Sequence, residues 1–263
     1  QPGQQISAAN LRALLAGSPI VASHRHGDPR VQDAYSLRCA PQVHGAARDV
    51  LDHVRAVTER ELAAGIDNPV VIDGRVASHG NFHGAPLAYA ADMAAIVLTD
   101  VAAMAERRVD RHLDANRSHG LPPFLAADPG VDSGLMLAQY TAAALVAECR
   151  RLSVPASVDS IPTSALQEDH VSMGWAAARK LRRVLDAVAG VLAVEAVTAG
   201  RALDLRAPLD PAAGTGAALT RLREVVPGPG PDRFLAPELA AAKAIVASGQ
   251  LLDAVTSTVE VVR

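Results

Sequence analysis

The chain contains few cysteines and few aromatic residues. Its two cysteines, Cys39 and Cys149, cannot form a disulfide framework in 263 residues, and no C-x-x-C spacing indicates a metal or redox pair. A reducing cytoplasm is therefore the expected compartment. Aromatic residues make up 3% of the chain while alanine is abundant, which favours closely packed helices over a sheet with large cross-strand pairs. We expect an all-α fold.

The chain also lacks an excess of positive charge and the common nucleotide-binding motifs. A net charge of -3 provides no basic field to attract nucleic acid or an anionic membrane. No G-x-G-x-x-G or Walker pattern indicates a nucleotide site. Histidines occur at residues 24 and 26 and as the pair His79 and His83, but no carboxylate or cysteine completes a metal-ligand set with them. Small molecules and other protein chains are the expected partners, with no metal, nucleic acid or membrane.

Long uncharged apolar runs are missing as well. Residues 87–98 and 184–199 are apolar, but Asp92 interrupts the first run, and Asp186 and Glu195 interrupt the second. Neither run provides the roughly 18 uncharged residues that a membrane-spanning helix requires. Because 49% of the chain is hydrophobic, both runs are expected to be core helices.

Apolar residues repeat at helical spacing along much of the chain. This spacing predicts helices over residues 44–65, with Gly65 as the C-cap, over 86–116 and over 135–152. A capping box, Ser164-x-x-Gln167, predicts the start of the longest helix, over 165–205. A rod of that length would measure roughly 60 Å and needs partners along it, so a helical bundle and an oligomer are expected.

Shorter elements complete the expected fold. Residues 70–72 and 76–77 flank Asp73-Gly74, which predicts a small two-stranded flap with a tight turn. After a proline- and glycine-rich segment, two short helices are expected, over about 236–247 and 250–261. We expect residues 1–206 to form the main helical part and residues 207–263 to form a short-helix extension of the same domain.

Residues 32–38 place three useful side chains three positions apart. Arg38 has a planar guanidinium that matches a carboxylate through two hydrogen bonds. Tyr35 can donate or relay a proton, and Gln32 can orient a carbonyl without adding charge. The triplet therefore suits the binding of an amino acid. The same spacing also suits an exposed helical stripe, so the motif alone leaves both interpretations open.

Three further clusters lie at chain breaks, in residues 67–69, 80–84 and 167–170. Glu168 is expected in the first turn of the longest helix, where the macrodipole would keep its carboxylate ionised. It could then accept an N–H from a cationic or imidazole-bearing ligand. The alternative is that Glu168 is only a favourable first-turn residue.

These motifs stand in a recognisable order. The chain reads Gln-Asp-Ala-Tyr-Ser-Leu-Arg-Cys from residue 32, Asp-Asn-Pro from 67, Gly-Asn-Phe-His from 80, Ser-His-Gly-Leu-Pro-Pro-Phe-Leu from 118, Pro-Ala-Ser-Val-Asp-Ser from 155 and Gln-Glu-Asp-His-Val-Ser-Met from 167. In this order it resembles the histidine ammonia-lyases of the aromatic amino acid ammonia-lyase family. The resemblance runs through nearly the whole chain and is strongest over residues 30–206.

The resemblance implies a fold and a reaction. It implies an all-α homotetramer of the ammonia-lyase and fumarase-like type, with each active site built from three subunits. The reaction would remove ammonia from L-histidine to give urocanate, with an electrophilic 4-methylideneimidazol-5-one group formed from an Ala-Ser-Gly tripeptide. The implied roles are carboxylate binding for Arg38, proton transfer for Tyr35, support of the electrophile and substrate for Gln32, support of the electrophile for Asn68, pocket lining for Phe82 and recognition of the imidazole for Glu168.

The electrophile is not expected to come from this chain. Its one Ala-Ser-Gly, at residues 247–249, lies near the C-terminus between apolar segments, whereas the family tripeptide precedes the Gln32 motif; Gly249 fits a C-cap between two helices. The chain thus resembles the C-terminal half of the enzyme, and its start without methionine fits a fragment or processed product. We expect it to be inactive without an N-terminal half, whether it is a truncated piece or one chain of a split system.

Other substrates and functions remain open at this stage. Gly84 follows the Asn-Phe-His run as it does in aromatic amino acid lyases, whereas Glu168 is generally absent from the phenylalanine and tyrosine branches. The alternatives are a phenylalanine or tyrosine ammonia-lyase, a 2,3-aminomutase of the same family, or a noncatalytic helical scaffold.

Overall fold

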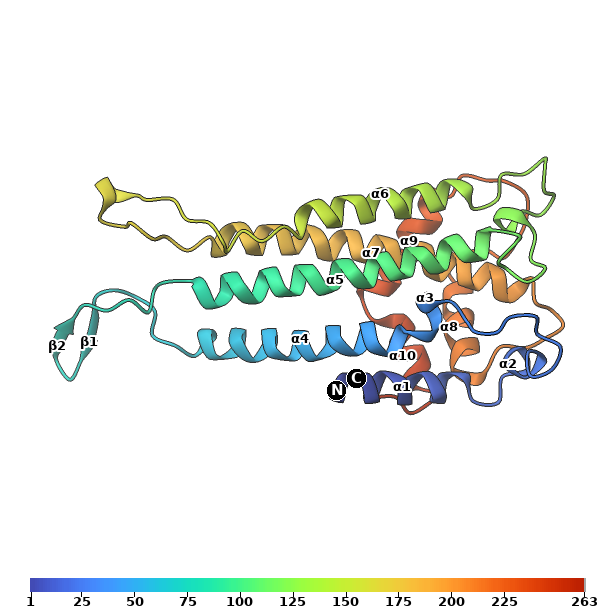
Figure 1. Ribbon diagram of the computed structural model, residues 1–263, viewed down its shortest axis with the longest axis horizontal. Helices are drawn as coiled ribbons and strands as arrows, with labels where there is room; N and C mark the ends of the chain where they lie inside the picture. Colours follow the sequence, from blue (N-terminus) through green and yellow to red (C-terminus); the bar gives the residue numbers. More distant parts are fainter. Residues whose placement is uncertain (263) are drawn as a thin grey trace.

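Four long helices define the protein in the computed structural model, which describes residues 1–262 (Figure 1). They are α4 (Ala40–Leu62), α5 (Ala85–Leu113), α6 (Met136–Leu152) and α7 (Gly174–Asp204). The four run side by side along the long axis of the molecule, and α5 and α7 pack against each other more extensively than any other pair of elements among the described residues. The all-α prediction is confirmed.

Short elements surround this bundle. The sequence pattern did not predict the helices within residues 2–23 or the one over residues 213–223, and the last helix ends five residues earlier than expected. The remaining helices are α1 (Pro2–Leu15), α2 (Pro19–Ser23), α3 (Tyr35–Arg38), α8 (Ala213–Arg223), α9 (Ala236–Ala247) and α10 (Gln250–Thr256), with single 3-10 turns η1 (Pro123–Leu125) and η2 (Ser164–Leu166). The helices after α7 share the main core, because Leu222, Ala242 and Ile245 pack in one cluster with α5, α6 and α7 residues.

The predicted two-stranded flap is present. Strand β1 (Val70–Ile72) pairs antiparallel with β2 (Arg75–Ala77), with Val71 opposite Val76. Asp73 and Gly74 both have positive φ angles, 50° and 73°, as a two-residue hairpin turn requires. The flap extends beyond the end of the bundle (Figure 1).

Small residues bring the two longest helices close together. Ala95, Ala102 and Ala105 on α5 are completely buried and share a cluster with the buried Val184 and Val191 of α7. Alanine keeps high helix propensity while allowing close packing, so this pairing follows from the composition. The expectation of core helices over residues 87–98 and 184–199 is confirmed.

By length and hydropathy alone, α5 is also a candidate membrane span, and half of the relevant window is buried inside the protein. Its charged interruption, Asp92, is buried and lies 3.1 Å from the ammonium group of Lys180 on α7. The core helix of a helical bundle passes the same length and composition test, so this helix needs no membrane to explain its apolar residues.

The predicted boundaries of α4 and α7 are wrong. Helix α4 begins at Ala40 rather than at residue 44 and ends at Leu62, and its C-cap is Ala63 rather than Gly65. Helix α7 begins at Gly174 rather than at residue 165, which shortens it to 31 residues, about 46 Å. The capping box does not form, because Ser164 makes no side-chain cap and Ser164, Ala165 and Leu166 all have positive φ angles. Residues 161–170 are all exposed, and the first buried residue of α7 is Ala177. The segment before α7 therefore buries no apolar face that would stabilise a helix.

Candidate functional site

The triplet in residues 32–38 lies on and beside the single helical turn α3. The amide of Arg38 donates to the carbonyl of Ala34, and that of Cys39 donates to the carbonyl of Tyr35, which closes the turn. The guanidinium of Arg38 lies over the Tyr35 ring, 5.0 Å from its centroid, and donates a hydrogen bond to Oε1 of Gln32. Tyr35 is 70% exposed. The structure therefore brings these three side chains together in an accessible group.

Asn68 lies apart from that group, at the base of the β flap. Its Oδ1 accepts hydrogen bonds from the hydroxyl of Ser78 at 3.3 Å and from the amide of His79 at 3.0 Å. Asn81 ties the same loop to the segment that follows α4, because its side-chain amide donates to the carbonyl of Gly65 at 2.8 Å. In the part of the chain that is described, these bonds use the side-chain oxygen of Asn68 and leave its NH₂ group available as a donor.

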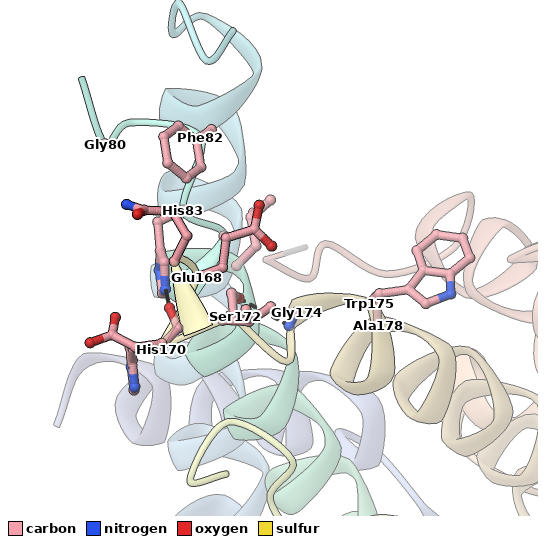
Figure 2. A pocket seen from close by; sticks show the side chains of 14 residues that line it. Gly80, Phe82, His83, Glu168, His170, Ser172, Gly174, Trp175 and Ala178 are labelled. Carbon is pink, nitrogen blue, oxygen red and sulfur yellow. Dashed lines mark hydrogen bonds between the residues drawn. The ribbon is translucent and has the colours of Figure 1, made fainter. Parts of the chain in front are cut away.

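A pocket of about 720 Å³ lies where the loop after the flap meets the loop before α7. Phe82, His83 and Glu168 lie along one side of it and Trp175 on the other (Figure 2). Phe82 is 57% exposed and Trp175 is 78% exposed, so both rings offer apolar surface to a ligand. The structure thus brings together the predicted residues Phe82 and Glu168.

One hydrogen bond links the two loops that form this pocket. Nε2 of His83 lies 3.0 Å from the carbonyl oxygen of His170, and the two imidazole rings stack with centroids 5.6 Å apart. The backbones also approach closely, because a Cβ on Gly174 would lie 3.1 Å from the carbonyl oxygen of Gly84. Sequence reasoning gave no role to His83, His170 or Trp175; the one signal was that Trp175 is the only tryptophan and directly follows the Glu168 motif.

Glu168 does not lie in a helix, contrary to the sequence prediction. The chain turns back at η2, so that Thr163 and Glu168 form an antiparallel bridge and the hydroxyl of Thr163 donates to the Glu168 carboxylate. Hydrogen bonds from Thr163 and Ser164 lower the pKa of this exposed carboxyl. The carboxylate is therefore ionised, as expected, but because of local hydroxyl donors and not because of a helix macrodipole.

The predicted residues form two separate groups within one chain. Gln32, Tyr35 and Arg38 lie with α3 alongside the bundle, whereas the flap and the η2 loop project from the far end of the long axis (Figure 1). Asn68, Phe82 and Glu168 all belong to that far end. A single copy of this chain therefore does not bring Arg38 and Glu168 to the same ligand.

A second cavity, of about 400 Å³, lies at the α3 side of the bundle and has several arginines in its wall. Most of these cations already have partners: Arg30 pairs with Asp28, Arg117 pairs with Asp110, and Arg206 donates to backbone carbonyls at 2.7 and 2.8 Å. Because most of the guanidinium groups in its wall are engaged within the chain, we assign no ligand to this cavity. Among residues 1–262, no group of three or more histidine, cysteine or acidic side chains is arranged to hold a metal ion.

The Ala-Ser-Gly tripeptide lies at the junction of α9 and α10, away from both groups. The C-cap of α9 is Ser248, and Gly249 is the N-cap of α10 with a φ angle of 79°, so the glycine lies between the two helices as predicted but one residue beyond the C-cap. The amide of Gly249 donates to the carbonyl of Val246 at 3.1 Å, and the Ser248 hydroxyl accepts from the Gln250 side chain at 2.8 Å. The backbone nitrogen needed for ring closure is thus used in an ordinary helix-end hydrogen bond.

Comparison with known proteins gives a consistent result. The family described as aromatic amino acid lyase matches residues 1–224. The chain is 63% identical to histidine ammonia-lyase of Streptomyces avermitilis over 255 residues, which covers 96% of this chain and 50% of that protein. It is 62% identical to histidine ammonia-lyase of Streptomyces coelicolor over 258 residues, with 97% and 50% covered. The chain spans about half the length of the curated relatives it matches.

Solved structures show the same similarity in three dimensions. Histidine ammonia-lyase from Trypanosoma cruzi aligns with a TM-score of 0.88 at 40% identity, covering 97% of this chain and 48% of that one. Tyrosine aminomutase from Streptomyces globisporus aligns with a TM-score of 0.89 at 37% identity, covering 99% and 53%. The fold alone therefore does not distinguish a lyase from an aminomutase.

Proposed function

The chain belongs to the aromatic amino acid lyase family, and on that premise we propose that it is the substrate-side part of a histidine ammonia-lyase, which converts L-histidine to urocanate and ammonia. The observation that carries the proposal is the ionised carboxylate of Glu168 at the pocket beside Phe82. A carboxylate can accept the N–H of an imidazole, whereas the ring of phenylalanine offers no such donor. The 62–63% identity to histidine ammonia-lyases supports the same substrate.

The other part of the proposed substrate site consists of Gln32, Tyr35 and Arg38, which lie on and beside α3. Arg38 forms no ion pair among the described residues, so its guanidinium is available to a substrate carboxylate through two parallel hydrogen bonds. Tyr35 in its phenolate form can accept the proton that leaves the carbon β to the substrate amine, and the side chain then holds that proton as the phenol. That proton is only weakly acidic, so its removal needs both a nearby base and withdrawal of electrons from the substrate.

Members of this family use the 4-methylideneimidazol-5-one group, and the residues present fit it. Gln32 and Asn68 each use the side-chain oxygen in an internal hydrogen bond, which leaves an NH₂ donor for a ring carbonyl. When bound, the group supplies the electrophile that withdraws electrons from the substrate. We propose that its precursor tripeptide lies in the part of the relatives that this chain does not match.

The tripeptide proposal has a direct test in residue Ser248. In a complete, active assembly, Ser248→Ala should leave both the ultraviolet absorbance of the prosthetic group and the turnover of histidine unchanged. Mass spectrometry gives an independent readout, because ring formation removes two water molecules. Loss of two waters from residues 247–249, or loss of the absorbance in Ser248→Ala, would overturn this assignment.

The separation of the two groups supports a site shared between copies of the chain. Since Arg38 and Glu168 lie far apart along one bundle, we propose that α3 of one chain meets the loops at the far end of another, in a homotetramer. Tyr89, Met93 and Ile96 lie on one face of α5 and are 55%, 39% and 47% exposed, a stripe suited to helix-to-helix association. We place this assembly in the cytoplasm, where the free thiols of Cys39 and Cys149 would stay reduced.

The proposed substrate is tested by supplying the half of the relatives that this chain does not match. The chain is joined to, or co-expressed with, the half of the Streptomyces avermitilis relative that it does not match. L-histidine, L-phenylalanine and L-tyrosine are then supplied in turn, and the absorbance of the unsaturated acid is followed. Urocanate formation supports the proposal. Activity confined to phenylalanine or tyrosine would instead assign the chain to the phenylalanine or tyrosine branch of the family. No product from any of the three amino acids would favour a noncatalytic scaffold.

The shared site is tested by mixing two impaired variants. Assemblies that carry only Arg38→Ala, or only Glu168→Gln, should both be impaired. After dissociation and reassembly together, about a quarter of the sites should combine an intact α3 with an intact far-end loop, because the two chains assort at random. Recovery of activity at that level supports a site between copies, and no recovery above the two separate variants contradicts it.

A further inference from the structure

The side chain of Arg108 joins three elements of the fold. It projects from α5 and grips Glu195 on α7 in a two-point pair, in which Nε donates to Oε1 and Nη2 donates to Oε2 at 3.1 Å. Its remaining nitrogen, Nη1, donates to the backbone carbonyl of Ser36 on α3 at 3.2 Å. The side chains of Arg108 and Glu195 are only 14% and 20% exposed, so solvent screens this pair weakly.

The α3 turn has few other means of holding its orientation. It contains only four residues, and its two largest apolar side chains, Tyr35 and Leu37, are 70% and 42% exposed. The hydroxyl of Ser36 is buried and has no hydrogen-bond partner within residues 1–262. Over the same residues, the bond from Arg108 to the Ser36 carbonyl is the one side-chain hydrogen bond that ties α3 to a long helix.

We propose that Arg108, anchored by Glu195, is a positioning residue that sets the orientation of Tyr35 and Arg38. A guanidinium is planar, so once two of its nitrogens are fixed by a carboxylate, the direction of the third is fixed as well. That third direction points at the carbonyl between Tyr35 and Leu37. The inference deepens the proposed function and rests on it, since α3 matters for turnover only if Tyr35 and Arg38 bind the substrate.

The chain offers a matched control in Arg223. This arginine on α8 donates through Nε to Asp204 at 3.0 Å and through Nη1 to the carbonyl of Val226 at 3.2 Å. The exposures of Arg223 and Asp204, 21% and 25%, are similar to those of the Arg108 pair. Arg223 thus repeats the chemistry of Arg108, a carboxylate and a backbone carbonyl on one guanidinium, but it does not contact α3.

The test compares Arg108→Lys with Arg223→Lys in the complete assembly. Lysine keeps the charge but cannot hold a carboxylate at two points and a carbonyl at a third. Arg108→Lys should lower kcat/KM for histidine about 10- to 100-fold, since small misplacements of reacting groups have effects of that size. Arg223→Lys should change kcat/KM less than about twofold, while both variants show similar shifts in Tm. Equal losses of kcat/KM in the two variants would overturn the positioning role.

Amide hydrogen exchange provides a readout that does not require turnover. In Arg108→Lys, peptides covering residues 35–39 should exchange roughly tenfold faster than in the unmodified protein, because the turn opens more often. The same peptides should be unaffected in Arg223→Lys. If the unmodified assembly converts no amino acid, the proposed function fails, while unchanged exchange at α3 in Arg108→Lys would separately refute the inference about Arg108.

Discussion

The guanidinium carbon of Arg38 lies 5.0 Å from the centroid of the Tyr35 ring, so the cation rests on the aromatic face beside it. Arg38 also donates to Gln32, and it pairs with no carboxylate among the residues described. An exposed cation–π contact contributes only about 0.5–1 kcal/mol. An incoming carboxylate that forms two charge-assisted hydrogen bonds can therefore engage this arginine readily.

Arg38→Lys should raise KM for histidine about 10- to 100-fold with a smaller effect on kcat. The substitution retains the charge but removes the two parallel hydrogen bonds to the substrate carboxylate. Steady-state kinetics of the complete assembly measure this. Arg25→Lys, an exposed arginine in the preceding loop, is the control and should leave KM unchanged. An unchanged KM in Arg38→Lys would remove the carboxylate-binding role.

Tyr35→Phe should lower kcat about 10²- to 10⁴-fold, with little change in KM or Tm. The phenol is proposed to hold the departing proton, and general acid–base groups contribute effects of this size. Because Tyr35 is 70% exposed, loss of its hydroxyl removes no buried contact. Tyr140→Phe, at an exposed tyrosine on α6, provides the comparison. If both variants keep full kcat, the base must be another group.

Glu168→Gln should reduce kcat/KM for histidine about 10- to 100-fold, because a hydrogen bond to a charged group contributes about 1.5–3 kcal/mol. The unfolding midpoint should change little, since this carboxylate is exposed. Asp169→Asn is the matched control, as it removes an exposed negative charge from the neighbouring position. Equal losses in the two variants would indicate a general effect of loop charge rather than recognition of the imidazole by Glu168.

Gly45→Ala should destabilise the protein by about 1–3 kcal/mol or more, because helices α1 and α4 cross in direct backbone contact there. A Cβ on Gly45 would overlap the backbone of Gln4, and a Cβ on Gly3 would overlap the carbonyl oxygen of Gly45. Urea unfolding measures the loss. Gly65→Ala is the control, since its Cβ would meet no atom within 4 Å and should cost little. A neutral Gly45→Ala would show that α1 does not pack as described.

Stability should fall as the pH drops below about 6.5. Burial lowers the pKa of both His44 and His112; at both, Glu195 opposes this shift and neighbouring arginines, including Arg108, add to it. These histidines are neutral when folded and bind protons more tightly when unfolded. The stability that comes from keeping these histidines neutral is therefore fully present above pH 6.5, the pKa of an unfolded histidine. It is lost as the pH falls toward the pKa of the folded state, at up to about 1.4 kcal/mol per pH unit for each histidine.

Urea unfolding between pH 7.5 and 5.5 tests this, because aspartate and glutamate titrate below that range. His112→Gln should reduce the slope of stability against pH, whereas His26→Gln, at an exposed position, should leave it unchanged. A slope that is the same in all three proteins would mean that His112 does not account for the acid sensitivity.

Local patterns predicted most of the helices and the flap. Helical spacing of apolar residues located α5 and α6 to within a few residues, and Asp73-Gly74 located the turn between β1 and β2. The same reasoning failed at residues 164–173, where a capping-box pattern was present but no helix formed. Leu166 is 71% exposed there, so the segment buries no apolar face that would outweigh its preference for turns.

The sequence by itself determined the helical class, the flap and the identity of the residues suited to an amino acid ligand, because propensity, turn chemistry and side-chain donors are local properties. Only the tertiary structure decided how those residues are grouped. It placed Arg38 with Tyr35 on α3 and Glu168 with Phe82 at the far end of the bundle, since helix α4, 23 residues or about 34 Å long, runs from the first group toward the second. It also placed Arg108 behind α3, a relationship between residues 72 positions apart that no local pattern contains.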